Sequence, residues 1–134
     1  MLSRARILRL YSTYYTKTHQ WVYFNYEERE VQVGITNYLQ SKLGRVQNID
    51  LPELNSAYSQ GDVIGVIKAQ NQTVNFLSPV TGETIQLNTT LNTQPELLNS
   101  SPEEKGWVCR FAIDNPTEVE KMMDKEAYEK YIQE

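Results

Sequence analysis

Short apolar runs separated by turn residues make up most of the chain between residues 19 and 113. The runs are rich in Val, Ile, Tyr, Phe and Trp, which strands favour, and residues such as Gly61, Asp62 and Pro79 interrupt them. The pattern predicts strands over residues 19–26, 30–35, 46–51, 63–67, 74–77, 84–87 and 107–113. A chain with this many short strands is expected to be mainly β.

One internal segment departs from the strand pattern. Residues 36–43 predict one or two helical turns, because Thr36 or Asn37 can act as the N-cap and Gly44 is a stop signal. A short internal helix is therefore expected between the second and third predicted strands.

The C-terminal segment predicts a second helix. Thr117 and Glu120 fit a capping box, in which the hydroxyl and the carboxylate satisfy first-turn amides. Apolar side chains then recur every three to four residues, as on one face of a helix. This stripe consists of Val119, Met122, Met123, Ala127 and Tyr131. We expect the stripe to pack on the strands, which leaves the methionines no role in binding a cofactor.

The composition is that of one soluble globular domain. The 134 residues are 40% hydrophobic and 22% charged, enough for one compact domain and too few for two ordinary ones. A formal net charge of -4 argues against a nucleic-acid-binding protein that relies on phosphate contacts. No stretch approaches the roughly 20 apolar residues that a membrane-spanning helix needs.

Few residues are available for metal or nucleophilic chemistry. The single cysteine, Cys109, excludes an intrachain disulfide and a cysteine-based metal cluster, and it lies in an apolar strand as a core residue would. The single histidine, His19, is interpreted as a packed, hydrogen-bonded residue beside Trp21 rather than a metal ligand. We therefore expect neither catalytic residues nor a metal site, and no enzymatic reaction.

The first 26 residues contain no acidic residue, whereas Arg4, Arg6 and Arg9 lie among apolar and Ser residues. This profile is typical of a mitochondrial transit peptide, and an ordinary basic N-terminal arm is the alternative. We therefore divide the chain into residues 1–14, a targeting segment or arm, and residues 15–134, the folded domain.

Several charged and aromatic residues are candidates for surface contacts. Residues 27–30 and 103–105 are interpreted as solvated turns, with a docking role for Glu27 and Glu28 as the alternative. The aromatic residues that look exposed are Tyr11, Tyr14, Tyr15 and Tyr23. Tyrosine is enriched at protein interfaces, so these four could anchor a partner.

Six motifs in register resemble the H protein family of the glycine cleavage system. They are Y-T-K-T-H-Q-W-V at 15–22, V-G-I-T-N-Y at 33–38, L-G at 43–44 with L-P-E at 51–53, S-P-V-T-G-E at 78–83, P-E-L-L-N at 95–99 and K-G-W at 105–107. The resemblance covers residues 15 to 132. It implies a lipoyl-domain-like hybrid barrel-sandwich with a short internal helix and a C-terminal helix.

In the family that this chain resembles, a hairpin carries a lysine at its tip that is acylated by lipoate. When the family pattern is aligned without gaps between Gly61 and Ser78, the lipoyl lysine falls on Asn71 and a family glutamate falls on Lys68. The side-chain amide of Asn71 is not a nucleophile, because its lone pair is delocalised into the carbonyl. Asn71 is therefore interpreted as a turn residue, and the lipoyl site as lost.

Lys68 is the substitute that we considered for the missing lysine. It lies three positions before the tip, so a lipoyl arm there would leave from the side of the hairpin, from the opposite strand face. A ligase that recognises the tip would also meet Gln70 and Gln72. Lipoylation of Lys68 is not expected.

Three functions are compatible with this resemblance. We favour a non-catalytic structural or accessory subunit of a mitochondrial multiprotein complex, for example the respiratory chain on its matrix side, without lipoate or another cofactor. The second is a regulatory adaptor that binds glycine-cleavage proteins and competes with the true carrier. The third is a lipoyl carrier that uses Lys68. The expected location is the matrix, including a peripheral place on the inner membrane, and the expected partners are protein subunits.

Overall fold

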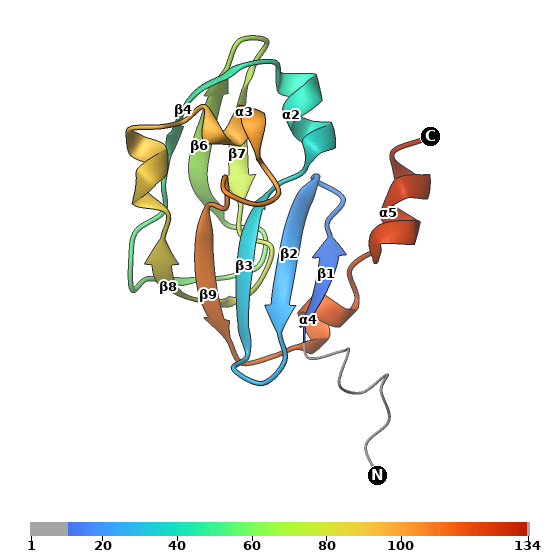
Figure 1. Ribbon diagram of the computed structural model, residues 1–134. Coiled ribbons are helices and arrows are strands. Elements are labelled where there is room, and N and C mark those ends of the chain that lie inside the picture. Colours follow the sequence, from blue (N-terminus) through green and yellow to red (C-terminus); the bar gives the residue numbers. More distant parts are fainter. Residues whose placement is uncertain (1–10, 134) are drawn as a thin grey trace.

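The predicted strands assemble into two antiparallel sheets (Figure 1). In the computed structural model, which describes residues 11–133, the larger sheet has the order β1-β2-β3-β9-β8-β5 and the smaller has the order β4-β6-β7. The strands are β1 Tyr11–Tyr15, β2 Gln20–Asn25, β3 Glu30–Ile35, β4 Val46–Asp50, β5 Ala57–Tyr58, β6 Val63–Ala69, β7 Thr73–Leu77, β8 Gly82–Leu87 and β9 Cys109–Ile113. All seven predicted strands are present, with bounds shifted by a few residues.

The core lies between the two sheets, because alternate residues of each strand point to one side. Val22 and Phe24 of β2 and Phe111 of β9 are buried in the same cluster as Ile67 of β6 and Phe76 of β7. Burying an aliphatic or aromatic side chain of this size contributes about 1.5–3 kcal/mol. The predicted fold class, mainly β and lipoyl-domain-like with short helices, is confirmed.

The short internal helix is confirmed as α2 (Asn37–Leu43). Thr36 is its N-cap, and the Thr36 side chain accepts a hydrogen bond from the Leu39 N–H. Gly44 ends the helix with φ 76°, a left-handed conformation that glycine adopts without steric cost. Two of the sequence signals, Thr36 and Gly44, thus act where they were expected, and Asn37, the alternative cap, is the first residue of the helix.

The folded domain begins before residue 15. Tyr11–Tyr15 form β1, an edge strand that pairs antiparallel with β2. Residues 11–14 therefore belong to the sheet and not to a separate arm, which corrects the predicted domain boundary. The predicted targeting segment otherwise falls on residues 1–10, which lie outside the described residues.

The predicted C-terminal helix is divided into α4 (Thr117–Glu120) and α5 (Lys125–Tyr131). The break occurs because Met123 pairs with Tyr15 at the edge of β1, with N···O distances of 2.8 and 3.1 Å. The capping box at Thr117 is wrong: the N-cap of α4 is Pro116, which makes no side-chain cap bond, and the Thr117 N–H donates to Asn115 Oδ1 at 3.0 Å. Asp124 instead caps α5 by accepting a hydrogen bond from the Ala127 N–H.

Three further elements had no clear signal in the apolar pattern. They are strand β5 and the short helices η1 (Thr89–Asn92) and α3 (Leu97–Ser100). The helices bury Leu91 and Leu98 in the core, so packing supplies what their length does not. Within residues 11–133, none of the helices has the length and apolar character needed to cross a membrane.

Candidate functional site

Asn71 lies at the tip of the β6–β7 hairpin. The two strands pair antiparallel with Lys68 opposite Thr73, and the Ala69 N–H donates to the Gln72 carbonyl at 3.1 Å to close the turn. Asn71 is exposed in this turn, an environment that asparagine favours. The hairpin stands at one end of the molecule, beside α2 (Figure 1).

The tip is bonded to the C-terminal end of α2. The Asn71 N–H donates to the Leu43 carbonyl at 3.0 Å, and the Asn71 side-chain amide donates to the Lys42 carbonyl at 3.3 Å. The Gln70 N–H donates to the Arg45 carbonyl at 2.8 Å. Because the last carbonyls of a helix lack partners within the helix, the two bonds from Asn71 satisfy those of Lys42 and Leu43, and the bond from Gln70 reaches the residue after Gly44. Asn71 therefore forms a structural contact between the hairpin and α2.

The residues at the tip do not fit a lipoyl group. Attachment needs an amine that can attack an acyl carbon, and the Asn71 amide cannot do so. Lys68 is exposed but lies inside β6, one residue before the strand ends. Its side chain leaves from the strand and not from the turn. Neither residue offers an amine at the tip.

His19 lies in an aromatic cluster at the turn between β1 and β2. A hydrogen bond of 3.0 Å joins its Nδ1 to the Tyr128 hydroxyl, which also bonds the Thr36 hydroxyl at 2.8 Å. The rings of Tyr38 and Tyr131 lie with their centroids 4.8 and 5.7 Å from the imidazole. Burial lowers the pKa of His19 and raises the pKa of Tyr128 to about 12. The prediction that His19 is packed and hydrogen-bonded is confirmed.

We expect the His19 environment to make stability depend on pH. Because its pKa is lower in the folded state than the unfolded value of about 6.5, the unfolded chain binds more protons between the two values. The contribution of His19 to the free energy of unfolding is therefore fully present above about pH 6.5. It is lost as the pH drops from there through the folded pKa. His19→Asn does not titrate and suits the left-handed backbone at φ 67°. The free energy of unfolding, measured with urea at several pH values, should depend less steeply on pH in this variant than in wild type. An unchanged pH dependence would contradict the assignment.

Cys109 is fully buried in β9, and burial raises the pKa of its thiol. A buried thiol with a raised pKa is an unreactive core residue, as predicted. Within residues 11–133, no cluster of three or more His, Cys, Asp or Glu side chains could hold a metal ion.

Two acidic residues interpreted as solvated are bonded to distant partners. The Glu103 carboxylate accepts the Asn37 N–H at the start of α2 at 2.7 Å. Glu30 forms a salt bridge of 2.8 Å with Arg110, and both side chains are half-buried. Glu104 is exposed as expected. The sequence carried no signal for these bonds, because their partners are 66 and 80 residues away.

Only part of the predicted tyrosine surface is exposed. Tyr11 and Tyr23 are 48% and 40% exposed, and their rings stack with centroids 5.5 Å apart. Tyr15 is only 8% exposed, because its ring stacks on Tyr128 at 4.7 Å, and Tyr14 is half-buried. Tyr128 is absent from the predicted apolar stripe. The sequence signal that could have identified Tyr128 as a buried residue was its aromatic ring, one position after Ala127 of the stripe.

Comparison with known proteins agrees with this architecture. The family model described as glycine cleavage H-protein matches residues 13–134. The chain is 37% identical over 117 residues to a glycine cleavage system H protein of Thermotoga maritima, covering 87% of this chain and 93% of that protein. It is 38% identical over 120 residues to glycine cleavage system H protein 3, mitochondrial, of Arabidopsis thaliana, covering 90% and 71%.

A solved structure shows the same fold. The crystal structure of a glycine cleavage system H protein from Mycobacterium marinum matches with a TM-score of 0.83 at 21% identity, covering 92% of this chain and 98% of that one. The family match extends over nearly all of the described residues, including the hairpin that ends at Asn71. The chain therefore belongs to the glycine cleavage H-protein family.

Proposed function

We propose that this chain is a non-catalytic member of its family, and that it serves as a structural or accessory subunit of a mitochondrial multiprotein complex. The observation that carries the proposal is Asn71 at the hairpin tip, where an ungapped alignment with the family pattern has the lipoyl lysine. Without an amine there, the hairpin tip offers no attachment point for the carrier chemistry of the family.

The contacts of Asn71 support this proposal. Its backbone and side chain both donate hydrogen bonds to the end of α2, so the tip has a structural role that a free lipoyl arm would not need. The rest of the chain keeps the fold of the family over two sheets. A chain that keeps the two-sheet fold of the family but has an unreactive hairpin tip supports protein binding as the function.

The location is part of the proposal. Arg4, Arg6 and Arg9 in an acid-free N-terminal segment support import into mitochondria. We place the protein in the matrix, including a peripheral position on the inner membrane, and we name the respiratory chain as one host complex. Binding to glycine-cleavage proteins as a regulatory adaptor is the alternative.

Native protein tests both parts of the proposal at once. Mitochondria are solubilised gently and fractionated by size, and the intact mass of this chain is measured in the fraction that contains it. We expect migration with a complex far larger than one chain at moderate salt, and a mass without a lipoyl increment. Migration as a free small protein would contradict the subunit role. A lipoyl increment mapped to Lys68 would establish the carrier alternative.

The recombinant chain provides a matched control. Incubated with a lipoate–protein ligase, lipoate and ATP, the wild-type protein should keep its mass. Asn71→Lys places an amine at the tip, and the modification of this variant shows that the ligase can reach the hairpin. Asn75→Lys, on the exposed face of β7 in the same hairpin, tests whether any added lysine suffices. Modification of wild type would overturn the loss of the site.

A further inference from the structure

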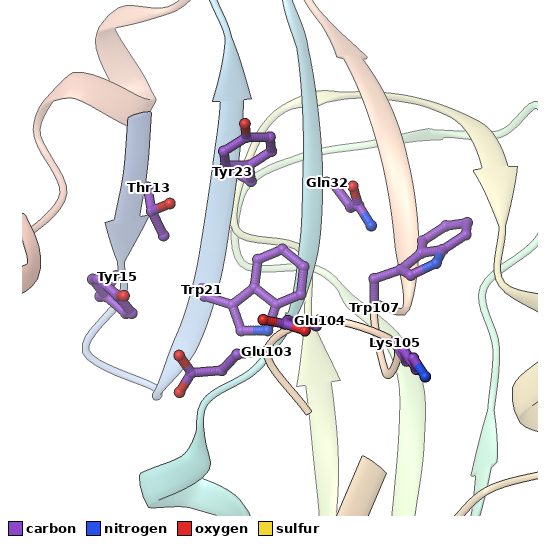
Figure 2. Close-up of a pocket in the computed structure, with 9 residues that line it drawn as sticks. All are labelled: Thr13, Tyr15, Trp21, Tyr23, Gln32, Glu103, Glu104, Lys105 and Trp107. Carbon is purple, nitrogen blue, oxygen red and sulfur yellow. The ribbon is translucent and has the colours of Figure 1, made fainter. Parts of the chain in front are cut away.

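A cavity of about 580 Å³ opens on the outer face of the larger sheet (Figure 2). No residue of the β6–β7 hairpin lines it. Cross-strand pairs place Tyr15 opposite Trp21, and Tyr23 opposite Gln32. Trp107 lies beyond Gln32, as Figure 2 shows. The outer face of a sheet is ordinarily polar, whereas four aromatic rings gather here. Tyr15, Trp21 and Trp107 also belong to the hydrophobic cluster that includes Tyr128 of α5, so part of this gathering is packing. The rings that stay accessible at the cavity are the ones that a ligand can contact.

The aromatic rings offer both a fixed floor and open faces. Trp21 and Tyr15 are 4% and 8% exposed and form the floor. The Trp21 indole is fixed because its Nε1–H donates to the Pro102 carbonyl at 2.9 Å. Tyr23 is 40% exposed although its ring stacks on that of Tyr11, and Trp107 is half-buried. Part of each ring therefore remains accessible to a ligand. A planar cation stacks favourably on rings of this kind.

Acceptor groups surround the rings. Glu103 uses one carboxylate oxygen, Oε2, for the Asn37 N–H, and Glu104 is exposed at the same rim. Gln32 is half-buried, and among residues 11–133 its side-chain amide has no hydrogen-bond partner. Burial raises the pKa of Tyr15, and the charge of Glu103 raises it further, which indicates a negative potential at the floor.

The positive charges nearby do not cancel this potential. Lys105 also lines the cavity, and in Figure 2 its ammonium end points away from Trp21. Arg110, opposite Gln32 on the next strand, is paired with Glu30 at 2.8 Å. The cavity therefore combines free acceptors, a net acidic rim and aromatic faces.

We infer that this cavity is a docking site for a partner protein that inserts an arginine side chain. The guanidinium group stacks on the open rings of Tyr23 and Trp107 and donates to Gln32 and to the carboxylates of the rim. The choice of a protein partner rests on the proposed accessory role. The site itself involves neither the hairpin nor lipoate, so a failed binding test leaves the result at Asn71 unaffected.

Tryptophan fluorescence tests the inference, because both tryptophans of the chain line the cavity. The full chain is titrated with Nα-acetyl-arginine amide and, in parallel, with the neutral analogue Nα-acetyl-citrulline amide. We expect saturable binding of the arginine probe in the millimolar range and binding of the citrulline probe weaker by about tenfold or more. Equal responses to the two probes, or no saturation with arginine, would overturn the inference.

Two sets of variants make the test specific. Glu103→Gln with Glu104→Gln should weaken arginine binding by about tenfold, while the glutamine at 103 can still accept the Asn37 N–H. Glu27→Gln with Glu28→Gln makes the same change in charge on an exposed turn and should leave binding unchanged. If both pairs of substitutions weaken arginine binding equally, then the effect comes from the net charge of the protein and not from a specific site, and the inference is overturned.

The arginines of the chain's own N-terminal segment are the competing occupant. Arg4→Gln, Arg6→Gln and Arg9→Gln are combined in the full chain, and the probe affinity is measured again. An unchanged affinity supports a site open to a partner. Binding that is detected only after these substitutions would overturn the inference that a partner protein occupies the cavity. It would assign the cavity to the chain's own N-terminal segment.

Discussion

Replacing Trp21 by alanine is expected to lower the free energy of unfolding by about 3–5 kcal/mol, the range for removing a buried large aromatic side chain. Trp21 is 4% exposed, and it contributes a hydrogen bond to Pro102 in addition to its packing. The indole lies directly over Gly34 of β3, where an added Cβ would be 2.7 Å from the ring. Urea unfolding followed by circular dichroism measures the loss.

The contact with Gly34 gives this prediction an internal check. Gly34→Ala alone should cost about 1–3 kcal/mol, because the new methyl group overlaps the indole. In the Trp21→Ala background the methyl group enters the vacated space, so the same change should cost almost nothing. Tyr23→Ala, on the same face of β2 but exposed, should cost about 1 kcal/mol or less. An equal cost of Gly34→Ala in both backgrounds would show that the indole is not the obstacle.

Local signals in the sequence sufficed for the elements that depend on neighbouring residues. Thr36 and Gly44 bracket α2, and the apolar runs locate the strands, because caps and strand patterns act within a few residues. The two strands of the hairpin also followed from their apolar runs. The position of Asn71 at the tip came from the resemblance to the family, and asparagine suits that turn.

The remaining features depend on contacts between distant residues. The stripe at the C-terminus has helical spacing throughout, but pairing of Met123 with Tyr15 extends the backbone and divides the helix. The acid-free composition around Tyr11 resembled a targeting segment, although the residues form an edge strand of the sheet. The bonds from Asn71 to α2 and from Glu103 to Asn37 likewise exist only after folding. A sequence pattern does not encode which surfaces meet.

Tyr128 carries the second large effect, because it attaches α5 to the body of the protein. Its ring stacks on Tyr15, and its hydroxyl bonds both His19 and Thr36. Tyr128→Ala removes all three contacts and should cost up to about 3–5 kcal/mol. The loss is limited by the free energy with which α5 docks, since a detached helix can unfold while the sheets remain.

The position of α5 at the side of the sheet makes local detachment measurable (Figure 1). In Tyr128→Ala, the amides of residues 128 and 132, which bond to the carbonyls of residues 124 and 128, should exchange hydrogen much faster, while those of β2 and β3 change little. Tyr128→Phe keeps the stack and loses only the hydroxyl, so it should cost about 1–3 kcal/mol. Tyr131→Phe, which loses one exposed hydrogen bond to the Lys17 carbonyl, should cost about 1 kcal/mol or less. If the α5 amides stay protected in Tyr128→Ala, then the helix is held by its other contacts and not by this ring.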